Sequence, residues 1–242
     1  GMPGAAILAS YAALRGGAGI VRLLHPDGMQ AELSNSPYEL IKQAYLSENE
    51  VVESLNKANA VFLGPGMGLS EKTIKLLRAV LPRIEKPCVI DADALNTIAL
   101  EKIPLPNQTI MTPHHGEMHR LLGLQDKQAF NLDFIQLCSD YSEKNNISLI
   151  LKGSPTFIFH PGQTPLISLH GDPGMATAGT GDVLTGLITA LLSQGLSTKD
   201  ASILGVHLHA LAGENASTQL TAYCMVASDL IDALPLAFEL LI

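Results

Sequence analysis

Residues 175–195 read Met175-Ala-Thr-Ala-Gly-Thr-Gly-Asp-Val-Leu-Thr-Gly-Leu-Ile-Thr-Ala-Leu-Leu-Ser-Gln-Gly195. The first half of this stretch is small and glycine-rich, and residues 183–192 have the apolar pattern of a buried helix. Where the halves join, at Gly179-Thr-Gly-Asp182, glycines allow successive backbone N–H groups to turn toward one point. A helix that starts there adds unpaired N–H groups and the positive end of its dipole. The stretch therefore predicts an anion site, most naturally for phosphate.

Asp182 places a carboxylate at the same point. As a structural residue it would cap the helix, because Asp is a favoured N-cap. As a functional residue it would stand beside the bound phosphate and take a proton from a hydroxyl that attacks phosphorus. We favour the functional interpretation and keep the cap as its alternative.

The composition indicates a protein with a large buried core. The chain has 242 residues, of which 47% are hydrophobic and none is Trp, and this length suits one large α/β domain or two small ones. The net charge of −8 argues against a nucleic-acid partner or an anionic membrane. Local N–H groups and a few cations would therefore have to hold a phosphate against the field of the whole molecule.

The cysteines and the first residues bear on location. Cys88, Cys138 and Cys224 are far apart and lack the spacing of metal ligands, so we expect no disulfide framework and a cytoplasmic location. No apolar run is long enough to span a bilayer. Residues 1–10 lack the basic segment of a signal peptide and begin directly on a helix, with Pro3 in its first turn.

Short apolar strands alternate with helices along the chain, which is the pattern of a parallel sheet covered on both faces. We expect strands at residues 19–24, 58–63, 87–90, 109–112 and 147–151, and a hairpin at 156–160 and 165–169. We expect helices at residues 5–14, 37–43, 48–57, 70–81, 113–122, 131–144, 183–194, 199–217 and 229–241. Because there is no internal repeat or long linker, we predict one three-layer αβα domain over residues 1–242.

In open parallel sheets, ligands bind outside the carboxyl ends of the strands. Unusual loops follow the expected strands at Gly64–Gly68, Asp91–Asn96, Thr112–Glu117 and Lys152–Thr156, and Gly179–Asp182 completes the set. Each loop is a weak signal alone, because glycine and polar residues are common in ordinary turns. Together they predict one ligand-binding edge.

Two of these loops carry carboxylates or histidines. Asp91 and Asp93 follow one strand and could hold Mg²⁺ through waters, or Asp93 could cap a helix that starts at Ala94. His114 and His115 precede Glu117, but no third ligand is spaced to support zinc.

The other two loops suit close backbone approach and phosphate. Gly64-Pro-Gly-Met-Gly68 reads as a tight turn, and its glycine spacing is not that of the dinucleotide fingerprint. Lys152 could neutralise a phosphate as a point charge, or the loop could simply turn into the next strand. These alternatives stay open from the residues alone.

The Gly-Thr-Gly-Asp segment resembles the anion-hole motif of the ribokinase-like superfamily. The longer Met-Ala-Thr-Ala-Gly-Thr-Gly-Asp-Val-Leu-Thr-Gly run is similar to the signature of the ADP/ATP-dependent NAD(P)H-hydrate dehydratases. The Gly-Pro-Gly-Met-Gly, Asp-Ala-Asp, Thr-Pro-His-x-Gly-Glu and Lys-Gly-Ser-Pro-Thr segments fit the same family, so the resemblance covers nearly the whole chain. It implies a ribokinase-like fold with a mostly parallel central sheet. In that family a strand precedes the first helix, so we expect this chain to lack the first strand.

The resemblance also implies roles for particular residues. Asp182 would be the catalytic base, and the nicotinamide-derived substrate would contact it together with Ala5, Gly66 and His114. Glu117 would face the phosphate and a metal ion. His115 occupies a variable position, so we assign it no role and expect its replacement by Ala to change little. The adenine nucleotide would contact Lys152, Gly153, Ser154, Pro155, Thr156, Gly179, Thr180 and Gly181.

The activity implied by the resemblance is repair of a damaged cofactor. The S-epimer of hydrated NADH or NADPH would be phosphorylated on its ring hydroxyl and would lose phosphate, giving NAD(P)H, AMP (or ADP) and phosphate, as in a carbon–oxygen lyase. Mg²⁺ would bridge the nucleotide phosphates, ADP is favoured over ATP, and a homo-oligomer without nucleic-acid or membrane partners is expected. The alternatives are a vitamin-precursor kinase of the same superfamily and a nucleotide-binding protein without turnover.

Overall fold

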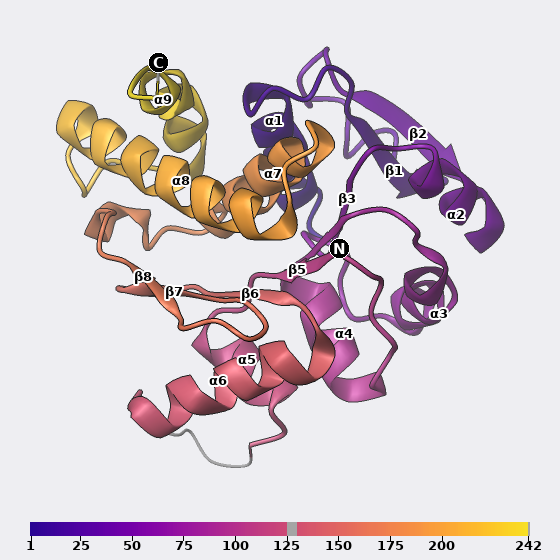
Figure 1. Cartoon of the computed structure of the whole chain (residues 1–242). Coiled ribbons are helices and arrows are strands. Elements are labelled where there is room, and N and C mark those ends of the chain that lie inside the picture. The colour runs from indigo at the N-terminus through magenta and orange to yellow at the C-terminus, as the bar shows by residue number, and fades with distance from the viewer. Residues whose placement is uncertain (125–129, 242) are drawn as a thin grey trace.

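The computed structural model describes residues 1–124 and 130–241. Within these residues the main sheet has six strands in the order β3-β4-β5-β6-β7-β8 (Figure 1). Neighbours from β3 to β6 are parallel, whereas β7 and β8 are antiparallel to their neighbours. The mostly parallel sheet and the hairpin at its edge are therefore confirmed. The strands are β3 (Val61–Leu63), β4 (Cys88–Ile90), β5 (Thr109–Met111), β6 (Ser148–Leu151), β7 (Thr156–Phe159) and β8 (Leu166–Ser168).

A second, two-stranded sheet is formed by β1 (Arg22–Pro26) and β2 (Ile41–Tyr45), which pair in parallel. The helix expected over residues 37–43 is wrong, because residues 38–40 form a turn and the chain continues as β2. Leu40 is buried in one cluster with Val21, and Ile41 pairs with Arg22. Tertiary burial and strand pairing outweigh the weak local helix pattern here.

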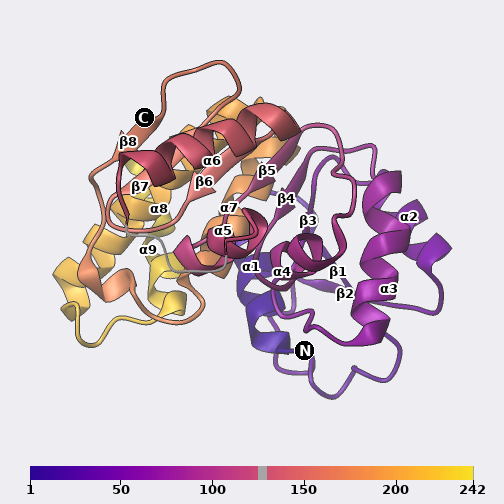
Figure 2. The same cartoon turned by 90° about the horizontal axis from the view of Figure 1, so that it is seen from below.

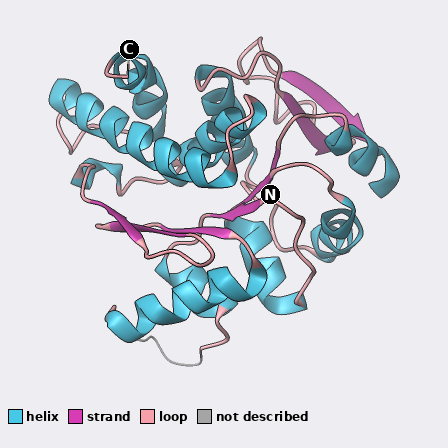
Figure 3. Ribbon diagram, viewed as in Figure 1, coloured by secondary structure: helices cyan, strands magenta, loops and turns pink. Residues whose placement is uncertain are grey.

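Helices cover both faces of the main sheet (Figures 1 and 3). Helix α7 contacts β3 and β4, α8 contacts β5 to β7, and α6 contacts β6 and β7 from the other side. The three-layer αβα arrangement is thus confirmed. One face carries α1 (Pro3–Arg15), α7 (Thr180–Ser193), α8 (Thr198–Leu220) and α9 (Ala227–Glu239), the other carries α3 (Glu71–Val80), α4 (Ala92–Glu101), α5 (His115–Leu121) and α6 (Leu132–Asn145), and α2 (Glu48–Asn56) packs against α3 and β2.

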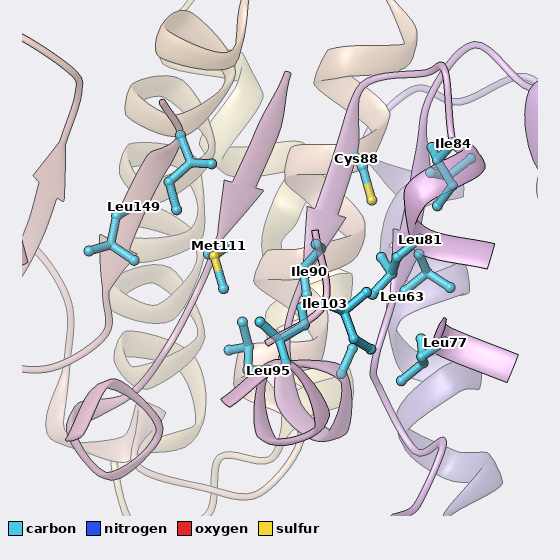
Figure 4. Close-up of a cluster of buried hydrophobic side chains, with 14 of the residues drawn as sticks. Leu63, Leu77, Leu81, Ile84, Cys88, Ile90, Leu95, Ile103, Met111 and Leu149 are labelled. Carbon is cyan, nitrogen blue, oxygen red and sulfur yellow. The ribbon is translucent and has the colours of Figure 1, made fainter. Parts of the chain in front are cut away.

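Side chains that alternate along the strands build a core on each face. On β4, Cys88 and Ile90 join the cluster of α3 to α6, while Val89 joins the cluster of α7 and α8. Figure 4 shows the first cluster, with Met111 and Leu149 from neighbouring strands pointing to the same side. Strands buried on both faces are near-continuous apolar runs, which is why the sequence revealed them.

Helices α1 and α7 pack unusually closely, and Figures 1 and 2 both show them side by side. A Cβ on Gly186 would lie 1.9 Å from Ala9 O, so the glycine permits this approach. The helix expected at residues 5–14 is confirmed, and α7 packs directly against it. Among the described helices, none has both the length and the apolarity to cross a bilayer.

Candidate active site

The first turn of α7 has the geometry of an anion site. Its N-cap, Gly179, has a left-handed backbone with φ of 95°, which glycine adopts without strain. The Thr180 hydroxyl donates to Met175 O at 2.8 Å and holds the approach to the helix. The helical ladder begins when Val183 N donates to Gly179 O at 3.1 Å. The N–H groups before it, including that of Gly181, belong to the helix end that attracts anions.

Asp182 does not cap this helix. It is the third residue of α7, Gly179 is the cap, and no side-chain hydrogen bond occurs at the cap position, so the cap interpretation is wrong. Burial raises the pKa of Asp182 to about 6; the charge of Asp91 adds to the rise and Lys152 opposes it. An unperturbed Asp has a pKa of about 3.9. The structure instead gives a carboxylate that titrates just below neutral pH.

Lys152 and Asp91 form an ion pair at the end of β6 and β4. Lys152 Nζ lies 2.7 Å from Asp91 Oδ1, and the two side chains are 20% and 1% exposed. The other carboxylate oxygen, Oδ2, accepts a hydrogen bond from Thr185 Oγ1 of α7 at 2.7 Å. Both oxygens of Asp91 therefore have partners within the protein.

The lysine stands at the start of α7. A Cβ on Gly181 would lie 3.1 Å from Lys152 Nζ, so two residues expected to bind the nucleotide are neighbours in space. Burial lowers the pKa of Lys152, but the charges of Asp91, Glu117 and Asp182 more than offset it, and the pKa is raised overall. The ammonium is therefore charged at neutral pH.

Asp93 holds a neighbouring loop instead of capping a helix. Helix α4 begins at Ala92 and has Asp91 at its N-cap position, so the cap predicted for Asp93 before Ala94 is wrong. Asp93 Oδ2 instead accepts from the backbone N of Gly68 at 2.7 Å. This contact joins the loop that follows β3 to the first turn of α4.

The Gly64–Gly68 loop meets the start of α1 by close backbone contact. Gly66 has φ of 70° and a Cβ there would lie 2.0 Å from Met2 O, while Met2 N donates to Gly66 O at 2.9 Å. A Cβ on Gly66 would also lie 3.4 Å from the Cβ of Ala5. The structure therefore brings together Ala5 and Gly66, which the resemblance placed beside the substrate.

His114 is the N-cap of α5. Its Nδ1 accepts from Gly116 N at 3.0 Å and from Glu117 N at 3.3 Å, and Glu117 Oε2 accepts from His114 N at 2.8 Å. This reciprocal arrangement is a capping box with His in place of the usual Ser or Thr. The side chain of His114 is 55% exposed, whereas that of Glu117 is only 6% exposed. His114 thus presents the rest of its ring to the outside.

His115 points elsewhere, into an aromatic cluster. Its ring lies edge-on to Phe130 with centroids 5.0 Å apart, and 6.1 Å from Phe134. A Cβ on Gly153 would lie 3.0 Å from His115 Cε1. Burial lowers the pKa of His115, with His119 and His114 adding to the effect. The absence of a site role for His115 stays a prediction, but the ring is packed beside Gly153 of the Lys152–Thr156 loop.

The Lys152–Thr156 loop joins the antiparallel strands β6 and β7. Lys152 N donates to Pro113 O at 2.8 Å, so this loop and the histidine loop are hydrogen-bonded neighbours. Thr156 Oγ1 donates to Gly153 O at 2.9 Å and closes the turn. Gly153 and Ser154 are exposed and Pro155 is partly exposed, so this backbone faces solvent beside α5.

Comparison with known proteins identifies the family. The sequence model of NAD(P)H-hydrate dehydratase matches residues 1–236. The chain belongs to the NAD(P)H-hydrate dehydratase family. It is 38% identical over 248 residues to the bifunctional NAD(P)H-hydrate repair enzyme Nnr of Moorella thermoacetica, covering 97% of this chain and 47% of that protein. The chain therefore spans about half the length of such curated relatives.

Another curated relative and solved structures agree. The ADP-dependent (S)-NAD(P)H-hydrate dehydratase of Xanthomonas campestris is 29% identical, over 97% of this chain and 83% of its own. A ribokinase-like superfamily protein from Enterococcus faecalis superposes with a TM-score of 0.87 at 27% identity, over 98% and 83% of the two chains. The ADP/ATP-dependent NAD(P)H-hydrate dehydratase of Bacillus subtilis, co-crystallised with ATP/Mg²⁺, gives 0.79 at 26% identity, over 98% and 85%. The fold is ribokinase-like, as expected.

Two further residues of this dehydratase-family chain support the site and were missed in the sequence. His209 Nε2 lies 2.8 Å from Thr180 O, and burial lowers the pKa of His209 to about 4, so a neutral ring donates to that carbonyl. Thr185 binds Asp91. A hydroxyl within an apolar helix needs a partner, which was a usable signal for Thr185. His209 had no such signal, because its partner lies on another helix.

The carboxylates near the site do not form a metal cage. Among the described residues, no group of three or more His, Cys, Asp or Glu side chains is placed to hold a metal ion. Asp91 is committed to Lys152 and Thr185, and Asp93 to Gly68. The metal role of Glu117 stays a prediction.

Proposed function

We propose that this chain dehydrates the S-epimer of hydrated NADH and NADPH at the expense of an adenine nucleotide. The observation that carries the proposal is the carboxylate of Asp182, which stands in the first turn of α7 without serving as its cap. A carboxylate left free at an anion-binding helix end suits a base that acts on a hydroxyl beside phosphorus. The family membership supplies the substrate class.

The reaction proceeds in two stages. The ring hydroxyl attacks the terminal phosphorus of the nucleotide, the oxygen–phosphorus bond forms, and the shorter nucleotide leaves. Asp182 takes the hydroxyl proton; with a pKa of about 6 it is mostly ionised at pH 7. The lone pair of the ring nitrogen then expels phosphate, and loss of a proton from the adjacent carbon restores the double bond. The second stage needs little from the protein.

The surroundings of Asp182 suit phosphoryl transfer. The N–H groups of Gly181 and Asp182, in the first turn of α7, can stabilise negative charge on the transferring group without rearrangement. The Lys152 ammonium lies beside Gly181 and supplies a cation at this point of an acidic chain. These features support a nucleotide site formed by Lys152–Thr156 and Gly179–Gly181.

The hydrate would bind on the opposite side of Asp182. Ala5 and Gly66, which lie close together, would supply a small uncharged surface for it. The exposed ring of His114, whose backbone bridges to Lys152, would contact it from the neighbouring loop. A crystal grown with ADP tests this division, because adenine should lie beside Lys152–Thr156. Adenine density at Gly64–Gly68 would exchange the two subsites.

Magnesium fits the site as an ion carried with the nucleotide. Mg²⁺ usually keeps several waters and uses one or two carboxylates together with substrate phosphates. The described residues offer no larger protein cage. Glu117, whose charge raises the pKa of both Lys152 and Asp182, is the carboxylate best suited to hold the ion. When bound, the ion neutralises phosphate charge during transfer. The preference for ADP, the homo-oligomer and the cytoplasmic location stay predictions.

The test is to incubate hydrated NADH with ADP or ATP and Mg²⁺, and to follow both reduced-nicotinamide absorbance and inorganic phosphate. We expect one phosphate for each NADH recovered. A vitamin-precursor kinase would leave NADH hydrate unchanged and keep phosphate on its own substrate. No turnover with either nucleotide would contradict the proposal.

A further inference from the structure

We infer that Asp91 is a positioning residue that fastens Lys152 and α7 together and so presents the lysine ammonium to the phosphates of the nucleotide. This role deepens the proposed function and rests on it for the site's occupant. One carboxylate serves two elements: Oδ1 accepts from Lys152 Nζ and Oδ2 accepts from Thr185 Oγ1, each at 2.7 Å. Both are charge-assisted hydrogen bonds, the stronger kind.

Asp91 is the fixed member of this group. Its N–H donates to Leu63 O at 3.0 Å and its carbonyl accepts from Ala94 N at 3.2 Å, so the backbone is held by β3 and α4. Lys152 belongs to the loop after β6, and Thr185 lies one turn along α7 from Gly181. A single anchored carboxylate therefore sets the distance between the lysine and the helix end.

Missing side chains make room for the pair. A Cβ on Gly64 would lie 1.7 Å from Asp91 O, and one on Gly181 would lie 3.1 Å from Lys152 Nζ. Glycine at 64 lets β3 approach the carboxylate's backbone, and glycine at 181 lets the ammonium reach the first turn of α7.

The pair is open at one end only. Asp91 is 1% exposed, while Lys152 is 20% exposed. A buried ion pair contributes little net stability on average, because desolvation cancels most of the attraction. A fully buried carboxylate behind a partly exposed ammonium is instead suited to hold that ammonium in place for an anionic ligand. The cost of burying Asp91 is offset by its two hydrogen bonds.

The charges around Asp182 give this role a readout that a purely structural contact lacks. The charged groups that act on Asp182 are Asp91 after β4, Asp93 in the first turn of α4, Glu117 in α5 and Lys152 in the loop after β6. The charge of Asp91 raises the pKa of Asp182 and also that of Lys152. Removal of that one charge therefore moves both ionisations in the same direction, toward lower pH.

Asp91→Asn tests the charge. The amide keeps the shape, because its oxygen can accept from Lys152 and its NH₂ can donate to the Thr185 hydroxyl. We expect the acid and alkaline limbs of the kcat/KM profile both to move down, by about one pH unit. We also expect equilibrium binding of ADP at pH 8 to weaken by roughly tenfold, because a neutral amide holds the ammonium less firmly than the carboxylate does and no longer raises the pKa of Lys152.

Thr185→Val tests the tether to α7 with the Asp91 charge intact. We expect the nucleotide KM to rise about tenfold, within the range that small misplacements cost, and Thr185→Ser to restore most of the loss. The matched control is Thr189→Val on the same helix, because the Thr189 hydroxyl donates only to Thr185 O of its own helix, at 2.8 Å, among the described residues. That control should bind ADP like the wild type.

The role of Asp91 would be overturned if Asp91→Asn moved neither limb of the kcat/KM pH profile and bound ADP like the wild type. It would also be overturned if Thr185→Val and Thr189→Val gave the same nucleotide KM and the same ADP affinity. If Asp91→Asn gives no cooperative thermal transition, the Thr185 series decides. If the wild type does not convert the hydrate, the proposed function fails, while the ADP-binding comparison across the four variants still decides whether Asp91 positions Lys152.

Discussion

The two sides of the candidate site are held together by different interactions: charged side chains on one side and close backbone contacts on the other. On the α7 side, Lys152 and Asp91 form a short ion pair, and burial raises the pKa of Asp182. On the β3 side, Gly64–Gly68 meets α1 through the backbone, and added Cβ atoms would collide with carbonyl oxygens. One side depends on which groups are ionised, and the other on which side chains are missing.

This difference matches what each side would have to do. A transferring phosphoryl group carries negative charge that must be neutralised and oriented, so its subsite needs cations, N–H groups and a base. An uncharged ring needs a close surface that places its hydroxyl correctly. Substitutions on the α7 side should therefore act on turnover and its pH dependence, and those on the β3 side on use of the hydrate.

Asp182→Asn should have the largest effect. The amide cannot accept the hydroxyl proton, so turnover should fall by about 10²–10⁴-fold, the usual range for a general base. ADP binding should persist. Asp133→Asn is the control, because Asp133 is an exposed acid in the first turn of α6. Near-wild-type turnover in Asp182→Asn would remove this residue from the mechanism.

The same variant should also be more stable. Because the pKa of Asp182 is raised in the folded state to about 6, the contribution of the neutral acid is present at low pH and is lost as the pH rises through 6. At pH 7 the ionised side chain therefore destabilises the fold, by about 1–3 kcal/mol. Asp182→Asn removes that cost, and differential scanning calorimetry should show a Tm higher by a few degrees.

Gly66→Ala tests the β3 side. The added methyl meets Met2 O at 2.0 Å on a residue with φ of 70°, so the loop must move. We expect kcat/KM for the hydrate to fall by up to about 10²-fold while ADP affinity is retained. Gly68→Ala is the matched control, because it has a similar φ of 74° but its Cβ would meet only Gly1 atoms at 3.5 Å. Equal losses would assign the effect to backbone strain alone.

The pH dependence tests the α7 side without a mutation. With a pKa of about 6 for Asp182, the ionised fraction should fall about tenfold between pH 7 and pH 5. The kcat/KM of the wild type should follow it, because this parameter reports ionisation of the free enzyme. An acid limb near pH 4 would mean that burial does not perturb Asp182 as the structure indicates.

The fold could be largely predicted because its signals are local. Buried strands such as Cys88–Ile90 are short apolar runs, and Ser70 before Glu71 marks a helix start that the structure confirms, with Ser70 accepting from Thr73 N. The error at β2 arose because its strand partner and the burial of Leu40 are tertiary facts. No local pattern contains them.

Loop position and resemblance predicted which residues would lie at this edge of the sheet. They did not predict which of these residues would bind one another. The sequence placed Lys152, Asp91 and Gly181 on one edge, yet it offered Asp91 as a metal ligand. The structure shows its oxygens bound to Lys152 and Thr185. Which partner a carboxylate takes depends on distances of a few ångströms between loops far apart in sequence, and the raised pKa of Asp182 follows from the same distances.

His114 and His115 carry the comparison to adjacent residues, with the smallest expected effects. His114→Ala removes the α5 cap, which should lower stability by about 1 kcal/mol. It also removes the exposed ring proposed to contact the hydrate, so kcat/KM for the hydrate should fall by about fivefold. His115→Ala leaves α5 capped but removes a ring packed at 5.0 Å from Phe130. It should lower stability by about 1 kcal/mol with the hydrate KM unchanged. Kinetics with hydrate varied at fixed ADP, beside thermal melts, separate the two. A loss of hydrate use in His115→Ala alone would show that the substrate-contacting histidine is the second of the pair.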